Sequence, residues 1–128
     1  MVVSHKHKFI YVHLGRTSGR SISFALSRHC GPDDIITPIS KRCHRGQNFE
    51  RFKRHDKAND IRQKLGEQVW NEYYKFTFER NPWEKIISRY WAYAGLDTNK
   101  SYKRIWQNLF GQPLDFANWF RMKVWQGR

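Results

Sequence analysis

The sequence is short of cysteine and of long apolar runs, and each shortage excludes a class of protein. Two cysteines among 128 residues, Cys30 and Cys43, cannot make the disulfide framework of a small secreted domain. They either pair with each other or remain free thiols. No CxxC and no Cys/His spacing typical of zinc sites occurs. No stretch of about 18 apolar residues could span a membrane, and residues 1–14 lack the apolar core of a signal peptide.

Acidic residues are also scarce, because 24 lysines and arginines stand against 11 aspartates and glutamates. The formal net charge of +13 predicts partners that are polyanions or small anions. Apolar residues make up 39% of the chain and aromatic residues 16%, which is enough for a packed core. Repeats, low-complexity segments and linkers are absent. We therefore expect residues 1–128 to fold as a single domain that is soluble and not exported.

Apolar periodicity predicts an alternation of strands and helices. Runs rich in β-branched and aromatic residues predict buried strands over 8–14, 33–40 and 73–79. Apolar spacing of three and four predicts helices over 21–29, 57–70, 80–95, 102–110 and 114–125. His5 and His7 are expected in a basic tail, and residues 41–57 in a long loop. This order predicts an α/β fold, with a parallel β-sheet flanked by helices and a helical C-terminal part.

Two of these helices carry start signals. Asn81 can cap the helix over 80–95, Pro82 suits its first position, and Glu84 stands where a capping box needs it. Gly95 is the expected end of that helix. Asp56 can cap the helix over 57–70 in the same way as Asn81.

The stretch HLGRTSGRSIS, residues 13–23, lies between the first strand and the first helix. A glycine-containing turn before a helix lets successive N–H groups converge on an anion such as phosphate or sulfate. Hydroxyl and guanidinium donors are added by Thr17, Ser18, Ser21, Arg16 and Arg20. The turn is also compatible with an ordinary strand-to-helix connection, in which Gly15 and Gly19 serve backbone shape alone.

The same stretch is close to a nucleotide-binding P-loop but departs from it. The pattern G-x-x-x-x-G-K-[ST] has one more residue between its glycines, and a lysine where this chain has Arg20. A nucleotide phosphotransferase with a degenerate P-loop is therefore one alternative. In that alternative, Glu79 would help to hold magnesium.

A second candidate anion contact follows the third strand. Arg80 ends the strand, and Ser88 lies two helical turns later, about 12 Å along the helix. A bidentate arginine and a serine hydroxyl at that spacing can converge on one ligand group. Taken alone, the pair fits better an arginine at a sheet edge and a serine that faces water.

Two segments resemble a known family, the carbohydrate sulfotransferases that use 3′-phosphoadenosine 5′-phosphosulfate (PAPS). They are FIYVHLGRTSGRSI (9–22) and KFTFERNPWEKIISRY (75–90). The family has a strand, a PKTGGTS-like loop and a helix, and later F-x-F-x-R-N-P-W/Y-x-R-x-x-S-x-Y. The resemblance covers residues 8–95 and implies a P-loop NTPase-like sulfotransferase fold in a short or C-terminally truncated member.

The resemblance implies a role for each matching residue. The 5′-phosphosulfate would be held by Arg16, Thr17, Ser18, Gly19, Arg20 and Ser21. The 3′-phosphate would be held by Arg80 and Ser88. Arg16 stands where the family has a lysine that contacts the bridging oxygen as the sulfuryl group leaves, and no metal is required. Ser18 and Arg20 replace a glycine and a threonine of the family pattern.

Transfer to a hydroxyl needs a base whose pKa lies near the working pH, which favours histidine. His55, in the basic loop before a helix, is the first candidate for this base. His44 is the second candidate, and Glu79 is a further one. His13 lies on a predicted strand and is expected to be a packed core residue.

The acceptor implied by the resemblance is a hydroxyl of a carbohydrate, and the basic loop over 41–57 suits an acidic glycan. The same loop suits nucleic acid, so a basic nucleic-acid-binding module is the other alternative. Against it, the aromatic residues fall mainly on apolar faces, and no helix-turn-helix or RNA-binding signature occurs. The chain as written is expected in the cytoplasm, or in the Golgi lumen as a fragment of an anchored enzyme.

Overall fold

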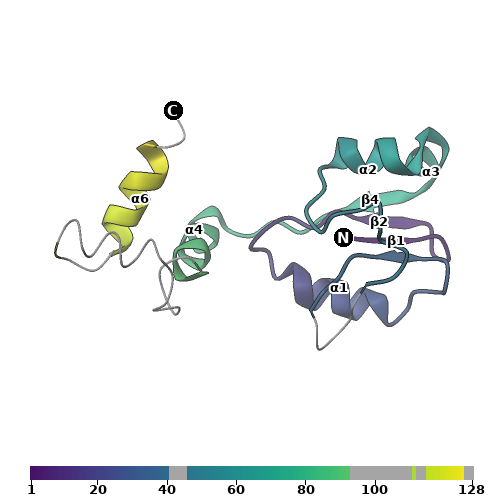
Figure 1. The fold of residues 1–128 in the computed structure, drawn as a ribbon, viewed down its shortest axis with the longest axis horizontal. Helices are drawn as coiled ribbons and strands as arrows, with labels where there is room; N and C mark the ends of the chain where they lie inside the picture. Colours follow the sequence, from purple (N-terminus) through teal and green to yellow (C-terminus); the bar gives the residue numbers. More distant parts are fainter. Residues whose placement is uncertain (41–45, 93–110, 112–114, 126–128) are drawn as a thin grey trace. The chain divides into compact units, whose positions relative to one another are not determined.

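The computed structural model describes residues 1–40, 46–92, 111 and 115–125. The chain divides into two compact units, Met1–Arg80 and Asn81–Arg128. The first unit contains a four-stranded sheet and three described helices, and two helices of the second unit are described (Figure 1). None of the described helices has both the length and the apolar character that a membrane crossing requires.

The sheet of the first unit is mixed rather than purely parallel. Its strands are β1 (Val2–Ser4), β2 (Phe9–Tyr11), β3 (Ile35–Ile36) and β4 (Tyr74–Phe76), in the order β3-β1-β2-β4. β2 and β4 pair in parallel, whereas β1 is antiparallel to both β2 and β3. The three predicted strands therefore point the same way. The prediction of a parallel sheet was nevertheless wrong, because β1 lies between two of them in the opposite direction.

Residues 1–8 form a strand and a turn instead of the expected basic tail. Val2 pairs with Tyr11 on one side and with Ile36 on the other, so β1 joins two segments that are distant in the sequence. Lys8 completes the turn in the left-handed region, with a φ of 53°. A strand this short is too brief for an alternating apolar pattern to show in the sequence. Its stability comes from pairing with the strands on both sides.

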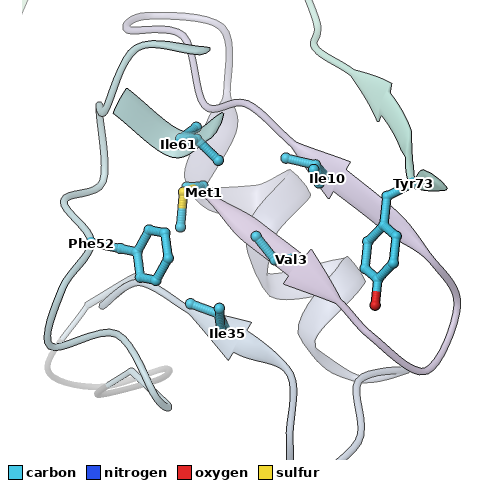
Figure 2. Close-up of a cluster of buried hydrophobic side chains, with 7 residues drawn as sticks. All are labelled: Met1, Val3, Ile10, Ile35, Phe52, Ile61 and Tyr73. Carbon is cyan, nitrogen blue, oxygen red and sulfur yellow. The ribbon is translucent and has the colours of Figure 1, made fainter. Parts of the chain in front are cut away.

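Helices cover both faces of the sheet, and each face has its own apolar cluster. α1 (Gly19–Ser27) lies on one side, and α2 (Ala58–Leu65) and α3 (Glu67–Glu72) lie on the other (Figure 1). Neighbouring residues of a strand point to opposite faces, so Ile10 joins the cluster of α2 and Tyr11 joins that of α1. Figure 2 shows the first cluster, whose buried members are Met1, Val3, Ile10, Ile35, Phe52, Ile61 and Tyr73.

The helix predicted over 57–70 is two helices that meet at Gly66. Gly66 has a φ of 87°, a conformation that ends α2 and begins α3. The prediction that Asp56 caps α2 was wrong, because the N-cap is Lys57. Asp56 is buried instead, and its carboxylate forms an ion pair with the ammonium group of Lys64. Its side chain therefore contacts the last turn of α2, through Lys64, rather than the first.

A buried carboxylate ties the hairpin turn to the segment before β3. Asp34 accepts from the Ser4 hydroxyl at 2.7 Å and from the N–H groups of His5, Lys6 and Gly31 at 2.6, 3.1 and 2.8 Å. Burial alone would raise the pKa of Asp34, but these hydrogen bonds outweigh it and hold the pKa below its ordinary value. Asp34 therefore stays ionised inside the fold.

In the second unit, α4 (Pro82–Tyr90) begins as the sequence predicts. Asn81 is the N-cap, and its side-chain oxygen accepts from the Trp83 N–H at 3.0 Å. Pro82 occupies the first turn, where its missing N–H costs nothing. Gly95, the expected end of this helix, lies outside the described residues.

The other described helix of the second unit is α6 (Phe116–Trp125), which confirms the helix predicted over 114–125. Tyr90 of α4 meets the rings of Phe116 and Trp119 edge-on, at centroid distances of 5.3 and 5.6 Å. Trp119 is 2% exposed. These aromatic contacts hold α4 and α6 together. The helix predicted over 102–110 lies outside the described residues.

Candidate functional site

The candidate anion site lies where two parallel strands end. Residues 12–18 follow β2, and residues 77–80 follow β4. The two segments continue side by side, because the Val12 N–H donates to the Phe76 carbonyl at 2.9 Å and the Thr77 hydroxyl donates to the Val12 carbonyl at 2.7 Å. Both segments therefore leave the same edge of the sheet, as predicted, and this edge is where ligands bind in α/β folds.

The backbone of the first segment alternates in handedness. Arg16 and Ser18 are in the left-handed region, with φ values of 67° and 58°, whereas Thr17 between them is not. Alternation of this kind can turn successive N–H groups toward one side, as in the anion-binding concavity called a nest. The left-handed region is unfavourable for residues with a side chain. Two such residues in one turn favour the anion interpretation over an ordinary connection.

The N-terminus of α1 adds further N–H groups to this loop. Ser18 is the N-cap, and the Ser21 N–H donates to the Ser18 carbonyl at 3.0 Å. The N–H groups of Gly19 and Arg20 precede that bond, in the part of a helix that has no intrahelical acceptors. The first turn of α1 contains no acidic residue. The positive end of the helix dipole is therefore not neutralised from within α1.

The side chains of the loop divide into exposed and buried groups. The exposed ones are Arg16, Ser18, Arg20 and Ser21. Thr17 is 5% exposed, and its hydroxyl donates to the Leu14 carbonyl at 2.9 Å. The hydroxyl proton of Thr17 therefore shapes the turn, while the exposed side chains are the ones that solvent and ligands can reach.

Gly19 is required by a packing contact beneath the loop. A Cβ at position 19 would lie 2.0 Å from Nε2 of His13, far inside van der Waals contact. His13 is 6% exposed, and its ring stacks on Tyr11 with 6.1 Å between centroids. The prediction that His13 is a packed core residue is confirmed. The glycine serves this contact in addition to the turn.

His55 is held beside the loop by a contact that sequence patterns did not predict. Its Nδ1 lies 3.1 Å from the His13 carbonyl oxygen, and the two rings meet edge to face with 4.7 Å between centroids. A carbonyl oxygen only accepts, so Nδ1 of His55 carries a proton, and in the neutral imidazole Nε2 then carries the lone pair. His55 is exposed, so the ring is accessible from solvent.

His13 is uncharged near neutral pH. Its pKa is lowered to about 4, mainly by burial and also by the N-terminal amino group, His55, Arg54 and Arg20. Burial also raises the pKa of Tyr11, although the Thr17 hydroxyl opposes the rise. The buried side chains of His13 and Tyr11 under the loop are therefore neutral, and exposed arginines carry the positive charge of the site.

Arg80 and Ser88 belong to different units. Arg80 is half-buried and is the last residue of the first unit. Its backbone N–H donates to the Glu79 carboxylate at 2.8 Å. Glu79 is exposed. Ser88 is half-buried in the last turn of α4. The convergence of Arg80 and Ser88 on one ligand group stays a prediction.

The remaining sequence candidates divide by whether the structure describes them. His44 and Cys43 lie outside the described residues. Cys30 is a free thiol that donates to the Leu26 carbonyl at 3.4 Å, and burial raises its pKa to about 12, which makes it unreactive. Within the described ranges, no group of three or more histidines, cysteines or acids could hold a metal ion.

Comparison with known proteins gives a match over nearly the whole chain. The family model described as Sulfotransferase family matches residues 1–122. An uncharacterized protein of Archaeoglobus fulgidus is 46% identical over 39 residues, which are 30% of this chain and 32% of the relative. The match thus spans about a third of that relative's length. No solved structure gives a significant match.

Proposed function

We propose, because the chain belongs to the sulfotransferase family, that it transfers a sulfuryl group from PAPS to a hydroxyl of a carbohydrate. The observation that carries this proposal is the loop of alternating handedness at the N-terminus of α1, with the exposed side chains of Arg16 and Arg20. A nest, a helix N-terminus and two guanidinium groups together favour a multiply charged anion over an uncharged ligand.

The loop suits the 5′-phosphosulfate end of the donor. The N–H groups of residues 17–20 and the hydroxyls of Ser18 and Ser21 would bind its oxygens, with Arg20 beside them. The donor supplies the sulfuryl group, and negative charge builds on the 5′-phosphate as that group leaves. Arg16 and the N–H groups would stabilise this charge, as preorganised donors do in phosphoryl transfer. The role of Arg16 would therefore be electrostatic.

Arg80 and Ser88 are proposed to bind the 3′-phosphate of the donor. The support is the match of RNP and of the later serine to the family motif, together with the position of Arg80 after the strand that neighbours the loop. A guanidinium group binds a phosphate through two parallel hydrogen bonds, and a serine hydroxyl adds a third. The 3′-phosphate distinguishes PAPS from ATP, so this pair would select the donor.

His55 is proposed as the general base. Its Nε2 holds the lone pair because Nδ1 donates to the His13 carbonyl. The proton of the acceptor hydroxyl would move to Nε2 of His55 as the oxygen attacks sulfur. His13 beneath it is uncharged at neutral pH, so it adds no positive charge that would oppose proton uptake.

The proposed acceptor is an acidic glycan. His55 is followed by Lys57 and preceded by Arg51 and Lys53, and all three basic side chains are exposed. The one acid among these positions, Asp56, is buried against Lys64. The surface around His55 is therefore positive, which attracts a negatively charged sugar chain.

Thermal unfolding with three ligands tests the donor. Adenosine 3′,5′-bisphosphate should raise the melting temperature by several degrees without metal, because a ligand at 100 times its Kd stabilises the folded state by about 2.7 kcal/mol. ATP with magnesium and a short oligonucleotide should give smaller shifts. A shift with ATP and magnesium alone would instead support the nucleotide phosphotransferase. A shift with the oligonucleotide alone would support the nucleic-acid-binding module.

Substitution of Arg80 tests the assignment of the 3′-phosphate. Arg80→Ala should abolish the shift with the bisphosphate, because the guanidinium group is its proposed bidentate partner. Arg89→Ala is the matched control, since it removes the same charge from an exposed residue of α4. An unchanged shift in Arg80→Ala would contradict the assignment.

Transfer of labelled sulfate from PAPS to a panel of glycans tests the reaction and its base. His55→Ala should lower kcat by roughly 10²–10⁴, the usual contribution of a general base. Its thermal shift with the bisphosphate should remain. His29→Ala removes another exposed loop histidine and should transfer at the wild-type rate. Equal rates in His55→Ala and the wild type would remove His55 from the mechanism.

A further inference from the structure

We infer that His13 is a positioning residue, which holds the imidazole of His55 in the orientation and tautomer that a general base needs. This inference rests on the proposed function of His55. It adds a residue that acts through His55 rather than on the donor or acceptor. All of the contacts involved lie within the first unit.

Two contacts from His13 end on His55. The backbone carbonyl of His13 accepts from Nδ1 of His55 at 3.1 Å, which fixes the tautomer. The ring of His13 meets the ring of His55 at 61° with 4.7 Å between centroids, which limits rotation of His55 about its ring axis. An exposed loop side chain without such contacts changes rotamer on the picosecond to nanosecond scale. These two contacts therefore give His55 a defined direction.

A third contact links the same ring to the anion loop. Position 19 has no room for a Cβ, because that atom would lie 2.0, 2.1 and 2.8 Å from three atoms of the His13 ring. Gly19 is the first residue of α1, and Ser18 before it closes the nest. The ring of His13 thus contacts both the anion loop, at Gly19, and the proposed base, His55. Their separation is set by that ring instead of by two independent loops.

Packing alone does not account for a histidine at this position. Nδ1 of His13 is buried and has no hydrogen-bond partner among the described residues. An apolar side chain would fill the space without leaving a polar atom unsatisfied. The charged or titratable groups that face His13 are the N-terminal amino group, His55, Arg54 and Arg20. These groups favour the neutral form of its ring, so it holds His55 without competing for the proton.

The experiment separates positioning from packing with two substitutions in the full chain. His13→Ala should loosen the fold, since it empties the space under Gly19. Gly19→Ala alone should be strongly destabilising because of the clash with the His13 ring. The double variant H13A/G19A should recover much of the lost stability, because the new methyl group occupies part of the empty space. Urea unfolding measures all three variants against the wild type.

The readout of positioning is the His55 ring itself, followed by NMR. In the wild type, the ¹⁵N shifts of His55 should show the Nδ1–H tautomer, and its ring protons should show shifts from the neighbouring ring. In H13A/G19A, the ring-proton shifts should collapse toward those of a free histidine, because the ring contact is lost. The Nδ1–H tautomer should remain, because the backbone carbonyl of residue 13 is still present. With a glycan that accepts sulfate, kcat of this variant should fall at least tenfold relative to the wild type.

Recovery of both stability and the wild-type His55 spectrum in the double variant would mean that His13 only fills space, and would overturn the inference. An unchanged His55 spectrum in His13→Ala would also overturn it. If that single variant does not fold, the double variant carries the comparison. Failure of the proposed function has a different signature: His55→Ala would transfer sulfate normally, while the NMR comparison would still decide whether His13 holds His55.

Discussion

At the residue scale, buried polar side chains determine how the stability of the first unit depends on pH. His13 has an ordinary pKa of 6.5 that falls to about 4 in the folded chain. Between those values the unfolded chain binds a proton that the folded chain does not, so acid removes stability by up to about 1.4 kcal/mol per pH unit. The pKa of Asp34 is also lowered in the folded state, from 3.8, so its contribution is lost at more acidic pH.

Asp34→Asn should destabilise the chain by roughly 3 kcal/mol at neutral pH. The NH₂ group of the new amide would face donors that bind a carboxylate oxygen in the wild type, so it would leave those donors without an acceptor. Asp33→Asn removes the same charge from the exposed neighbour and should change stability little. Urea unfolding at neutral pH measures both variants. The difference in free energy of unfolding between Asp34→Asn and the wild type should become smaller below pH 3.8, where the carboxylate of the unfolded chain is protonated. Equal losses in the two variants would contradict this account.

Residue identity predicted part of the site, and the missing part depends on tertiary contacts. The burial of His13 could be predicted from the expected strand over 8–14, where the alternate residues Tyr11 and His13 share a face. The contact between His13 and His55 could not, because 42 positions separate them in the sequence and no periodicity links a strand to a loop. Asp34 was missed for the same reason, since its partners in β1 and in the hairpin turn come from a segment expected to be a tail.

At the element scale, the turn into α1 carries backbone strain at the site. Ser18, the N-cap, has a φ of 58° and a ψ of 21°, a left-handed conformation that glycine adopts more easily. The sulfotransferase pattern that the sequence resembles has a glycine here. The structure thus gives a physical reason for that glycine, which is backbone conformation in addition to close approach of a ligand. Strain held at a binding loop is consistent with a functional constraint on the turn.

Ser18→Gly should stabilise the chain by about 0.5–1 kcal/mol, because relief of the left-handed conformation exceeds the added entropy of the unfolded chain. Ser18→Ala is the matched control, since it removes the hydroxyl but keeps a Cβ and therefore keeps the strain. Thermal unfolding of both variants measures the difference. Equal melting temperatures for the two variants would show that the conformation of Ser18 does not store the energy.

Elements with strong local signals were predicted, and those that depend on pairing were not. The start of α4 at Asn81 and Pro82 is encoded by adjacent residues, so it could be read from the sequence. β1 is specified by its two neighbours in the sheet, which no local pattern reveals. The break at Gly66 was missed because Ile61, Leu65 and Val69 keep helical spacing across it, although the backbone there adopts a positive φ.

At the scale of the whole molecule, the sheet, both apolar clusters and the proposed anion loop belong to the first unit. Every buried member of the two clusters lies between Met1 and Tyr73. Arg80 is the last residue of this unit, and Ser88 belongs to the second unit. The order of strands and helices predicted the α/β class. The net charge of +13 predicted anionic partners without distinguishing a small donor from a polymer.

Salt dependence distinguishes a built donor site from general attraction to negative charge. Binding of a single-stranded oligonucleotide to a chain of charge +13 releases counterions, so its affinity should fall steeply with salt, with a logarithmic slope of about −0.7 per phosphate contact. Adenosine 3′,5′-bisphosphate carries only two phosphate groups, and hydrogen bonds from the loop contribute to its binding. Titration calorimetry between about 50 and 200 mM salt should show a loss below tenfold for the bisphosphate and a loss of about 300-fold or more for an oligonucleotide with six or more phosphate contacts. An equally steep loss for the bisphosphate would mean that surface charge, and not the loop, holds the small anion.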